Sequence, residues 1–215
     1  MPKGDFLVIP QVSSERRRYI PIGYMDDSVL CSDKVRIMPN ISLYHFGILT
    51  SNVHMAWMRA ICCRLKSDYS YTVNNVYNAF PWCEPTPEQK DKIEKTAQAI
   101  LDARALYPDS SLADLYDETV MPPELRKAHQ ANDKAVMAAY GFPPKMPESE
   151  IVAELMKMYQ KLTEAEGVAV AASFSFSSKS RGKVFNSQTR CGKSEKEKKC
   201  KKRPLYFYRY ASAIV

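Results

Sequence analysis

At 215 residues, of which 45% are hydrophobic, the chain is long enough to bury one large core or two small ones. It holds no apolar run of about 18 residues and its first residues lack a signal peptide, so we expect a cytoplasmic protein rather than a membrane protein. The net charge of +7 comes from residues 179–215, with 12 Lys and Arg against 2 Asp and Glu, whereas residues 1–178 hold 19 against 22. The charge alone therefore does not indicate nucleic-acid binding.

The first 80 or so residues predict a mixture of strands and helix. Short β-branched runs broken by Pro, Gly, Asp and Asn predict strands between residues 5 and 40. From Tyr44 to about Arg64, apolar residues recur every three or four positions, a pattern typical of one amphipathic helix. The aromatic-rich segment at residues 69–81 then predicts a return to extended structure.

Residues 84–166 predict an all-helical region. The Thr-Pro-Glu-Gln segment at residues 86–89 supplies an N-cap, a proline at the first helical position and a capping box. After a short helix, a longer one is expected to begin near Pro123 and to end at Gly141. The last predicted helix covers residues 147–165, with its apolar stripe facing a core.

Residues 167–215 have no apolar period and are rich in Ser and Lys, so they predict a low-complexity, disordered basic tail. The predicted fold class is therefore α+β, with an all-α region and then this tail following the mixed N-terminal part.

No catalytic or metal-binding motif is recognisable. The seven glycines never fall into a dinucleotide-binding or P-loop spacing, and neither a nucleophile elbow nor an H-E-x-x-H motif occurs. The six cysteines form no C-x-x-C pair, which argues against a zinc site. We therefore expect no catalytic residue, no metal and no cofactor in this chain, and no enzyme activity of its own.

Five long blocks occur in order between about residues 5 and 165: IPQVSSERRRYIPIGYMD, LYHFGILTSNVHMAWMRAICCRLKSDYSYTVNNVYNAFPW, AQAILDARALYPDSSLADLYD, MPPELRKAHQANDKAVMAAYGF and AELMKMYQKLT. Together they resemble the C-terminal part of the MmeI-like (type IIL) restriction-modification enzymes and their adenine-specific DNA methyltransferase relatives. In that family a nuclease and a methyltransferase precede a target recognition domain and a helical C-terminal domain.

The resemblance implies a domain organisation and a set of partners. Residues 1–83 would be a partial DNA target recognition domain, residues 84–166 the helical C-terminal domain, and residues 167–215 a tail that the family does not share. Double-stranded DNA is the implied partner, together with a methyltransferase domain or chain, and no membrane. S-adenosylmethionine would bind to that methyltransferase domain, whose motifs this sequence lacks.

Two residues of the block RLKSDY are implied to choose a base pair. In the family, the two positions matched by Lys66 and Asp68 help to decide which base pair is accepted at one place in the target. A lysine can donate to the two major-groove acceptors of guanine, and a carboxylate can accept from the amine of cytosine, so the expected preference is a G·C pair. Alternate residues of an extended segment face one way, which would aim both at one groove. The alternative is a surface ion pair worth about 0–1 kcal/mol.

Other polar residues around this pair are weaker candidates for DNA contacts. The arginine run at residues 16–18 can grip phosphates or form a solvated turn, and Arg64 can hold a phosphate or brace the loop. The acidic helical region is expected to lie off the duplex. The candidate contacts are Arg16, Arg17, Arg18, Lys34, Arg36, Arg64 and Ser70.

The leading interpretation is thus a DNA sequence-recognition module of an adenine-specific methyltransferase or restriction-modification enzyme, binding in the major groove and inactive alone. One alternative is a helical protein-interaction module that docks a separately encoded methyltransferase chain. Another is a gene remnant without function.

Overall fold

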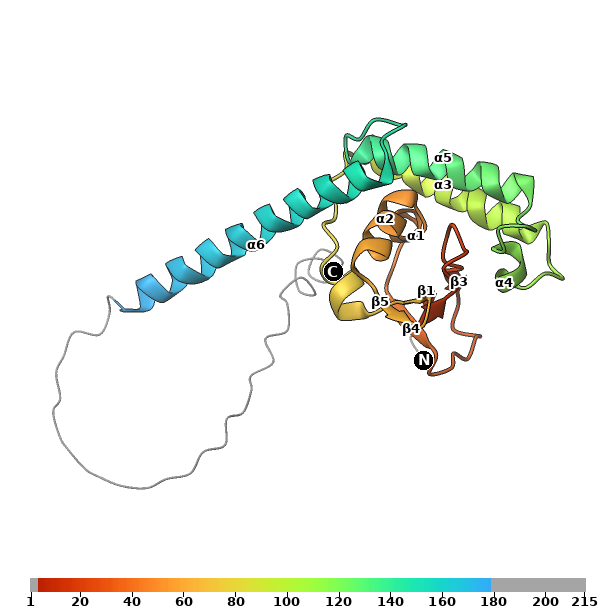
Figure 1. Cartoon of the computed structure of the whole chain (residues 1–215), viewed down its shortest axis with the longest axis horizontal. Helices are drawn as coiled ribbons and strands as arrows, with labels where there is room; N and C mark the ends of the chain where they lie inside the picture. Colours follow the sequence, from red (N-terminus) through yellow and green to blue (C-terminus); the bar gives the residue numbers. More distant parts are fainter. Residues whose placement is uncertain (1–3, 179–215) are drawn as a thin grey trace, which may run out of the picture. The chain divides into compact units, whose positions relative to one another are not determined.

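A three-stranded antiparallel sheet opens the fold. The computed structural model describes the backbone of residues 4–178 and the side chains through residue 164. Strand β1 (Phe6–Pro10) lies between β3 (Gly23–Met25) and β4 (Val35–Pro39), as Figure 1 shows. Leu7 and Ile9 alternate toward the core and are fully buried, as the period of two in a strand requires.

A second antiparallel sheet continues from the first. Its central strand is β6 (Asp68–Ser70), which pairs with β2 (Val12–Ser13) on one side and β5 (Cys63–Leu65) on the other. Gln11 joins the two sheets, because its N–H donates to the carbonyl of Lys34 (3.0 Å) and its carbonyl accepts from the N–H of Tyr71 (2.8 Å).

The prediction of one helix from Tyr44 to about Arg64 is wrong, because this segment forms two helices. Two residues, Thr50 and Ser51, separate helix α1 (Leu43–Leu49) from helix α2 (Asn52–Ile61). The Ser51 hydroxyl donates to the carbonyl of Ile48 (2.6 Å) and accepts from the N–H of His54 (3.4 Å). One side chain thus closes the first helix and caps the second, a competition with the helical backbone that apolar periodicity does not reveal.

The extended segment predicted after the second sheet is interrupted by a turn of π-helix, η1 (Val73–Tyr77). Its wide turn is closed by the N–H of Asn78, which donates to the carbonyl of Val73 (2.9 Å). The indole N–H of the buried Trp57 donates to the carbonyl of Val76 (3.1 Å). A tertiary contact from α2 therefore stabilises a conformation that local sequence does not predict.

The helical region begins as predicted. Helix α3 (Pro87–Ala105) has Pro87 at its first position, and the capping box between Thr86 and Gln89 is present. The Thr86 N–H donates to the Gln89 side chain (2.9 Å), and the Gln89 N–H donates to the Thr86 hydroxyl (3.3 Å). These reciprocal bonds satisfy two of the free N–H groups at the helix start.

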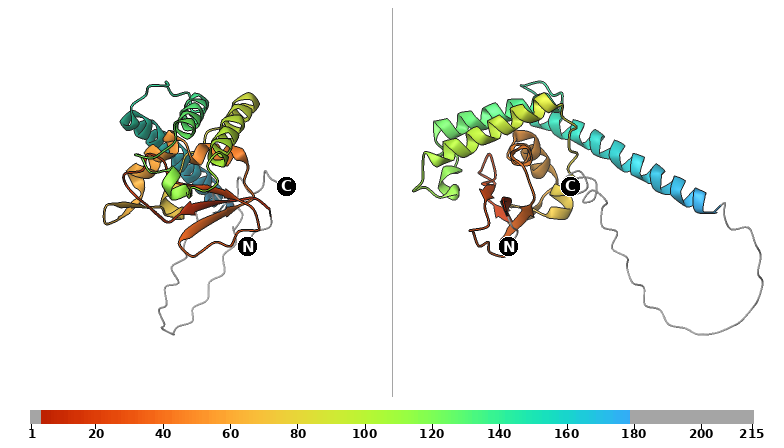
Figure 2. Two further views of the ribbon diagram at one scale, coloured as in Figure 1. Left: turned by 90° about the vertical axis from the view of Figure 1, so that its right-hand side faces the viewer. Right: turned by 180° about the vertical axis from the view of Figure 1, so that it is seen from behind.

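Helix α4 (Leu112–Leu115) and helix α5 (Pro123–Ala139) complete the region, and α5 runs beside α3 (Figure 2). Gly141 follows α5 with a φ of +72°, the left-handed conformation expected of a glycine after a helix. The predicted α+β class with helices following is thus confirmed.

One hydrophobic core runs through both parts of the chain. Helix α1 approaches α3 and α5 at Gly47, where a Cβ atom would lie 2.6 Å from Ile93 Cγ2 and 3.3 Å from Ala97 Cβ. The Asn132 amide of α5 donates to the Gly47 carbonyl (2.7 Å). A glycine is therefore required in mid-helix, because only its lack of a side chain allows this close contact.

Helix α6 (Glu148–Ser178) extends past residue 166, where the sequence predicts the helical region to end. The described residues up to Tyr159 belong to one compact unit, and α6 begins in this unit and continues beyond it. Most of the predicted basic tail, residues 179–215, lies outside the described residues. Within the part of the chain that is described, no helix is long and apolar enough to cross a membrane.

Candidate nucleic-acid interface

Lys66 and Asp68 lie at the tip of a β-hairpin. Strands β5 and β6 are joined by the two-residue turn of Lys66 and Ser67, and Leu65 pairs with Asp68 at its base. Lys66 has a φ of +57°, a left-handed conformation that side chains other than glycine rarely adopt. The prediction that Lys66 and Asp68 share one extended segment is therefore wrong, since Lys66 occupies the turn while Asp68 begins strand β6.

Strand pairing assigns the hairpin side chains to two faces. Tyr69 and Ser13, which are directly paired, are both buried and form the inner face. Asp68 and Ser70 alternate with Tyr69 and so lie on the opposite, outer face, where both are half-buried. Two of the candidate residues thus share the face of the hairpin that the core does not cover.

Arg64 braces the hairpin from its inner side. Its guanidinium donates to the carbonyl of Ser67 (2.9 Å), lies 4.2 Å from the centre of the Tyr69 ring and forms an ion pair with Glu15 (3.7 Å). Two roles were predicted for Arg64, a phosphate contact and bracing of the loop, and these contacts show that it braces the loop. A phosphate contact by Arg64 stays a prediction.

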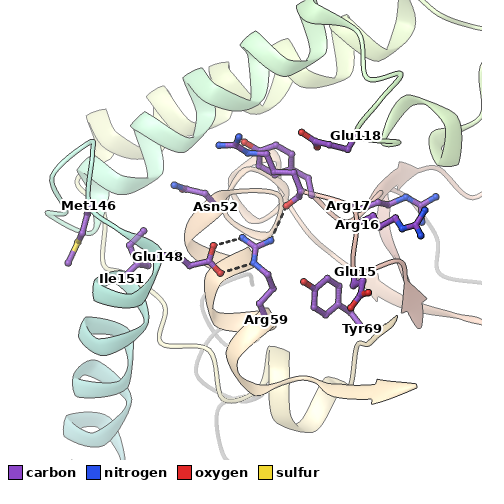
Figure 3. Close-up of a pocket in the computed structure, with 12 residues that line it drawn as sticks. Glu15, Arg16, Arg17, Asn52, Arg59, Tyr69, Glu118, Met146, Glu148 and Ile151 are labelled. Atoms are coloured by element: carbon purple, nitrogen blue, oxygen red, sulfur yellow. Dashed lines mark hydrogen bonds and ion pairs between the residues drawn. The ribbon is translucent and has the colours of Figure 1, made fainter. Parts of the chain in front are cut away.

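The arginine run lies beside this hairpin. Residues 16–18 and Tyr69 of the hairpin line the same pocket, which has a volume of about 460 Å³ (Figure 3). Arg16 and Arg18 are exposed, while Arg17 is half-buried and donates to the carbonyl of Ala113 in α4 (3.3 Å). The structure therefore brings residues 16–18 and the hairpin together, although about 50 residues separate them in sequence.

Arg59 and Glu148, which the sequence did not single out, fix the backbone of the arginine run. Arg59 donates twice to the Glu148 carboxylate (2.7 and 2.9 Å), as Figure 3 shows. It also donates once to the carbonyl of Arg18 (3.1 Å). A two-pronged arginine–carboxylate bond of this kind holds both partners in one geometry. Because 89 residues separate the two, no local sequence signal could have paired them.

A buried carboxylate lies behind the arginine run. Asp133 of α5 accepts from the Tyr19 hydroxyl (2.6 Å) and from the N–H of Asn52 at the start of α2 (2.7 Å). Burial raises the pKa of Asp133 to about 6, and these hydrogen bonds oppose that shift. Burial also lowers the pKa of His129, which stacks on Tyr19, to about 3. Two residues of α5 thus fix the position of Tyr19, which directly follows the arginine run.

The remaining candidates lie along β4 and its approach. Lys34 is exposed and pairs with its neighbour Asp33 (3.1 Å). Arg36 is half-buried opposite Ile9, and its Nε is buried without a hydrogen-bond partner. Through Gln11 the start of β4 is linked to the end of β6, so the predicted residues surround the two connected sheets. Among the described residues, no group of three or more His, Cys, Asp or Glu could hold a metal ion.

Comparisons with known proteins define the class to which this fold and hairpin belong. Residues 2–84 match the family model of the MmeI target recognition domain, and residues 85–165 match that of the MmeI C-terminal domain. The chain therefore belongs to the MmeI family and carries these two domains, which confirms the resemblance seen in the sequence.

Two relatives illustrate the match. The chain is 38% identical over 158 residues to DNA methyltransferase A of Bacillus subtilis (strain 168), covering 74% of this chain and 18% of that protein. A solved structure of the type IIL restriction-modification enzyme MmeI in complex with DNA superposes with a TM-score of 0.73 at 47% identity, covering 76% of this chain and 22% of that one. The chain thus spans about a fifth of the length of either relative.

The turn conformation predicts a stability effect that is separate from DNA binding. Lys66→Gly is expected to raise the free energy of unfolding by up to about 1 kcal/mol, because the left-handed conformation costs a side-chain-bearing residue about 1–2 kcal/mol and glycine's extra unfolded-state entropy offsets part of that gain. Urea denaturation measures the change. Ser67→Gly is the matched control: Ser67 has no positive φ, so its replacement should lower stability instead.

Proposed function

We propose that the chain is the DNA sequence-recognition module of an adenine-specific DNA methyltransferase or restriction-modification enzyme, and that it binds duplex DNA in the major groove. The observation that carries the proposal is the match of residues 2–165 to the MmeI recognition and C-terminal domains, together with a similar solved structure of MmeI in complex with DNA. The exposed hairpin tip, with the cation Lys66 in its two-residue turn and the anion Asp68 directly after the turn, supports it.

A two-stranded hairpin is a kind of element that suits this role. The major groove is about 12 Å wide and admits a two-stranded ribbon. Lys66, at the first turn position, would donate to guanine O6 and N7, while Asp68, at the start of the next strand, would accept from cytosine N4. The arginine run beside the hairpin and Arg64 on its first strand would set the register of the hairpin on the phosphates without reading sequence.

Removal of either charged group should relax the choice of base pair. Lys66→Ala or Asp68→Ala is expected to cost about 1–3 kcal/mol of discrimination at one position, with little loss of affinity for unrelated duplexes. The measurement is selection of duplexes from a random pool by the purified chain, followed by binding constants for the four base pairs at the selected position.

Asp91→Ala and Lys95→Ala are the matched controls. Both residues are exposed on α3, and their replacement changes the net charge by the same amounts without touching the hairpin. If these variants lost discrimination as Lys66→Ala and Asp68→Ala do, overall charge rather than base contact would be responsible. If the parent chain selected no sequence at all, the proposed function would fail.

Catalysis is proposed to come from elsewhere. The matched regions are recognition and C-terminal domains, not catalytic ones, so methyl transfer from S-adenosylmethionine would be performed by a methyltransferase domain or chain acting with this one. Mixing the chain with the catalytic part of a relative tests this. Methylation that appears only in the mixture, at the sequence this chain selects, is the expected result.

A further inference from the structure

The outer face of the hairpin sheet carries apolar groups that the core does not use. Leu65 is 57% exposed and Val12 is 39% exposed, and Cys63 is also exposed. The register places all three on the same face as Asp68 and Ser70, because residues paired directly across strands project to one side. This face therefore offers an acceptor, a hydroxyl and apolar surface together.

Leu65 is the apolar residue nearest to the acceptor. It pairs directly with Asp68 across the closing position of the hairpin, and directly opposed side chains have Cβ atoms about 4.5–5.5 Å apart. Val12 and Cys63 are both paired with Ser70, two residues further along β6. A ligand atom bound by the Asp68 carboxylate would therefore have Leu65 beside it, with the other two apolar groups farther away.

The major-groove edge of cytosine has a matching arrangement. Its N4 amine is attached to C4, and the adjacent C5 carries a hydrogen that faces the same groove, at the position where thymine carries its methyl group. A carboxylate that accepts from N4 brings a neighbouring apolar side chain against C5. An apolar side chain cannot hydrogen-bond to the base. What it can distinguish at this place is whether C5 carries a hydrogen or a methyl group.

We propose that Leu65 contacts the C5 position of the cytosine that Asp68 reads, so that binding responds to methylation of that carbon. This inference rests on the proposed function. Because more than half of the Leu65 surface is open, a 5-methyl group has room to lie against it and adds apolar contact. A methyl group buried in this way tightens binding by about two- to fourfold.

The test compares duplexes that carry cytosine or 5-methylcytosine at the base pair selected by the parent chain. Dissociation constants are measured for the full chain and for two variants, Leu65→Ala and the matched control Val12→Ala. The parent and Val12→Ala are expected to prefer the methylated duplex by about two- to fourfold, whereas Leu65→Ala binds both equally. Leu65 is exposed, so its truncation leaves the fold intact, which circular dichroism verifies.

The outcomes separate this inference from the function on which it rests. If the parent chain selects a G·C pair through Lys66 and Asp68 but binds the methylated duplex equally or more weakly, the role of Leu65 is overturned and the recognition function stands. A methyl preference that survives in Leu65→Ala overturns it as well. If no sequence is selected, both proposals are overturned together.

Discussion

Replacement of Arg104 by alanine is expected to lower the free energy of unfolding by about 3 kcal/mol. Arg104 lies on α3 and is only 9% exposed, and its guanidinium donates to the carbonyl of Ile22 (2.9 Å) and, through Nε, to the Tyr116 hydroxyl (3.0 Å). It also lies 5.1 Å from the centre of the Phe46 ring. Each hydrogen bond from a charged donor contributes about 1.5–3 kcal/mol, and its removal leaves the Ile22 carbonyl buried without this donor.

Arg126→Ala is the matched control for this prediction. Arg126 also lies in a C-terminal helix and also makes an ion pair, with Glu118 (2.9 Å), but both side chains are partly exposed. Its loss is expected to cost less than about 1 kcal/mol. Urea denaturation followed by tryptophan fluorescence compares the two variants, and equal small losses would contradict the bridging role of Arg104.

The Arg104 variant also tests whether the two family domains fold together. Arg104 belongs to the C-terminal domain, whereas Ile22 and Phe46 belong to the recognition domain. The Gly47 contact with α3 crosses the same boundary. Since one hydrophobic core includes residues of both, we expect a single unfolding transition. The C-terminal domain would then act as the support that holds the arginine run and the hairpin of β5 and β6 in place.

The parts of this fold that the sequence predicted correctly depend on neighbours in the chain. The start of α3 follows from a threonine, a proline and a glutamine within four positions, and the glycine after α5 follows from the need for a positive φ. In each case the stabilising atoms lie within one helical turn. Local residue types therefore sufficed.

The parts that could not be predicted depend on distant atoms or on one unfavourable conformation. Lysine gives no sign that it will adopt a φ of +57°, and the tight turn at Lys66 replaced the extended segment that was expected. The π-helical turn depends on Trp57, and the anchoring of the arginine run depends on Arg59 and Glu148. The base-reading role of Lys66 and Asp68 was predicted from the family resemblance and not from their spacing alone, which also fits a plain surface ion pair.

The second large effect is expected from pH at Asp133. Burial raises its pKa from the usual 3.8 to about 6, against the opposing effects of the hydrogen bonds from Tyr19 and Asn52 and of the charges of Arg18 and Arg59. Between about pH 4 and pH 6 the folded protein therefore holds a proton that the unfolded chain has released. Stability from this group is complete below pH 4 and is lost as the pH rises through 6.

Asp133→Asn removes this titration and isolates its effect. A shift of about two units corresponds to about 3 kcal/mol, so the stability of the parent relative to Asp133→Asn should fall by about that amount between pH 4 and pH 7. The neighbouring His129, with its pKa lowered from 6.5 to about 3, is neutral in the folded protein and gains a proton on unfolding below about pH 6.5, so it makes both proteins more stable as the pH rises. This contribution is common to both proteins and cancels in the difference between them. Urea denaturation of both proteins at four pH values gives the difference directly.

The exposed Asp91 of α3 supplies the control, because Asp91→Asn should change stability by no more than about 0.5 kcal/mol at any of these pH values. A flat difference between the parent and Asp133→Asn would mean that the Tyr19 and Asn52 hydrogen bonds outweigh burial. A falling difference would mean that the chain retains a costly buried carboxylate at the junction of its two domains. The reason to retain it would be position, because Asp133 holds both the start of α2 and Tyr19, the residue after the arginine run. Loss of these two bonds should therefore loosen the arginine run even where removal of the buried carboxylate stabilises the fold.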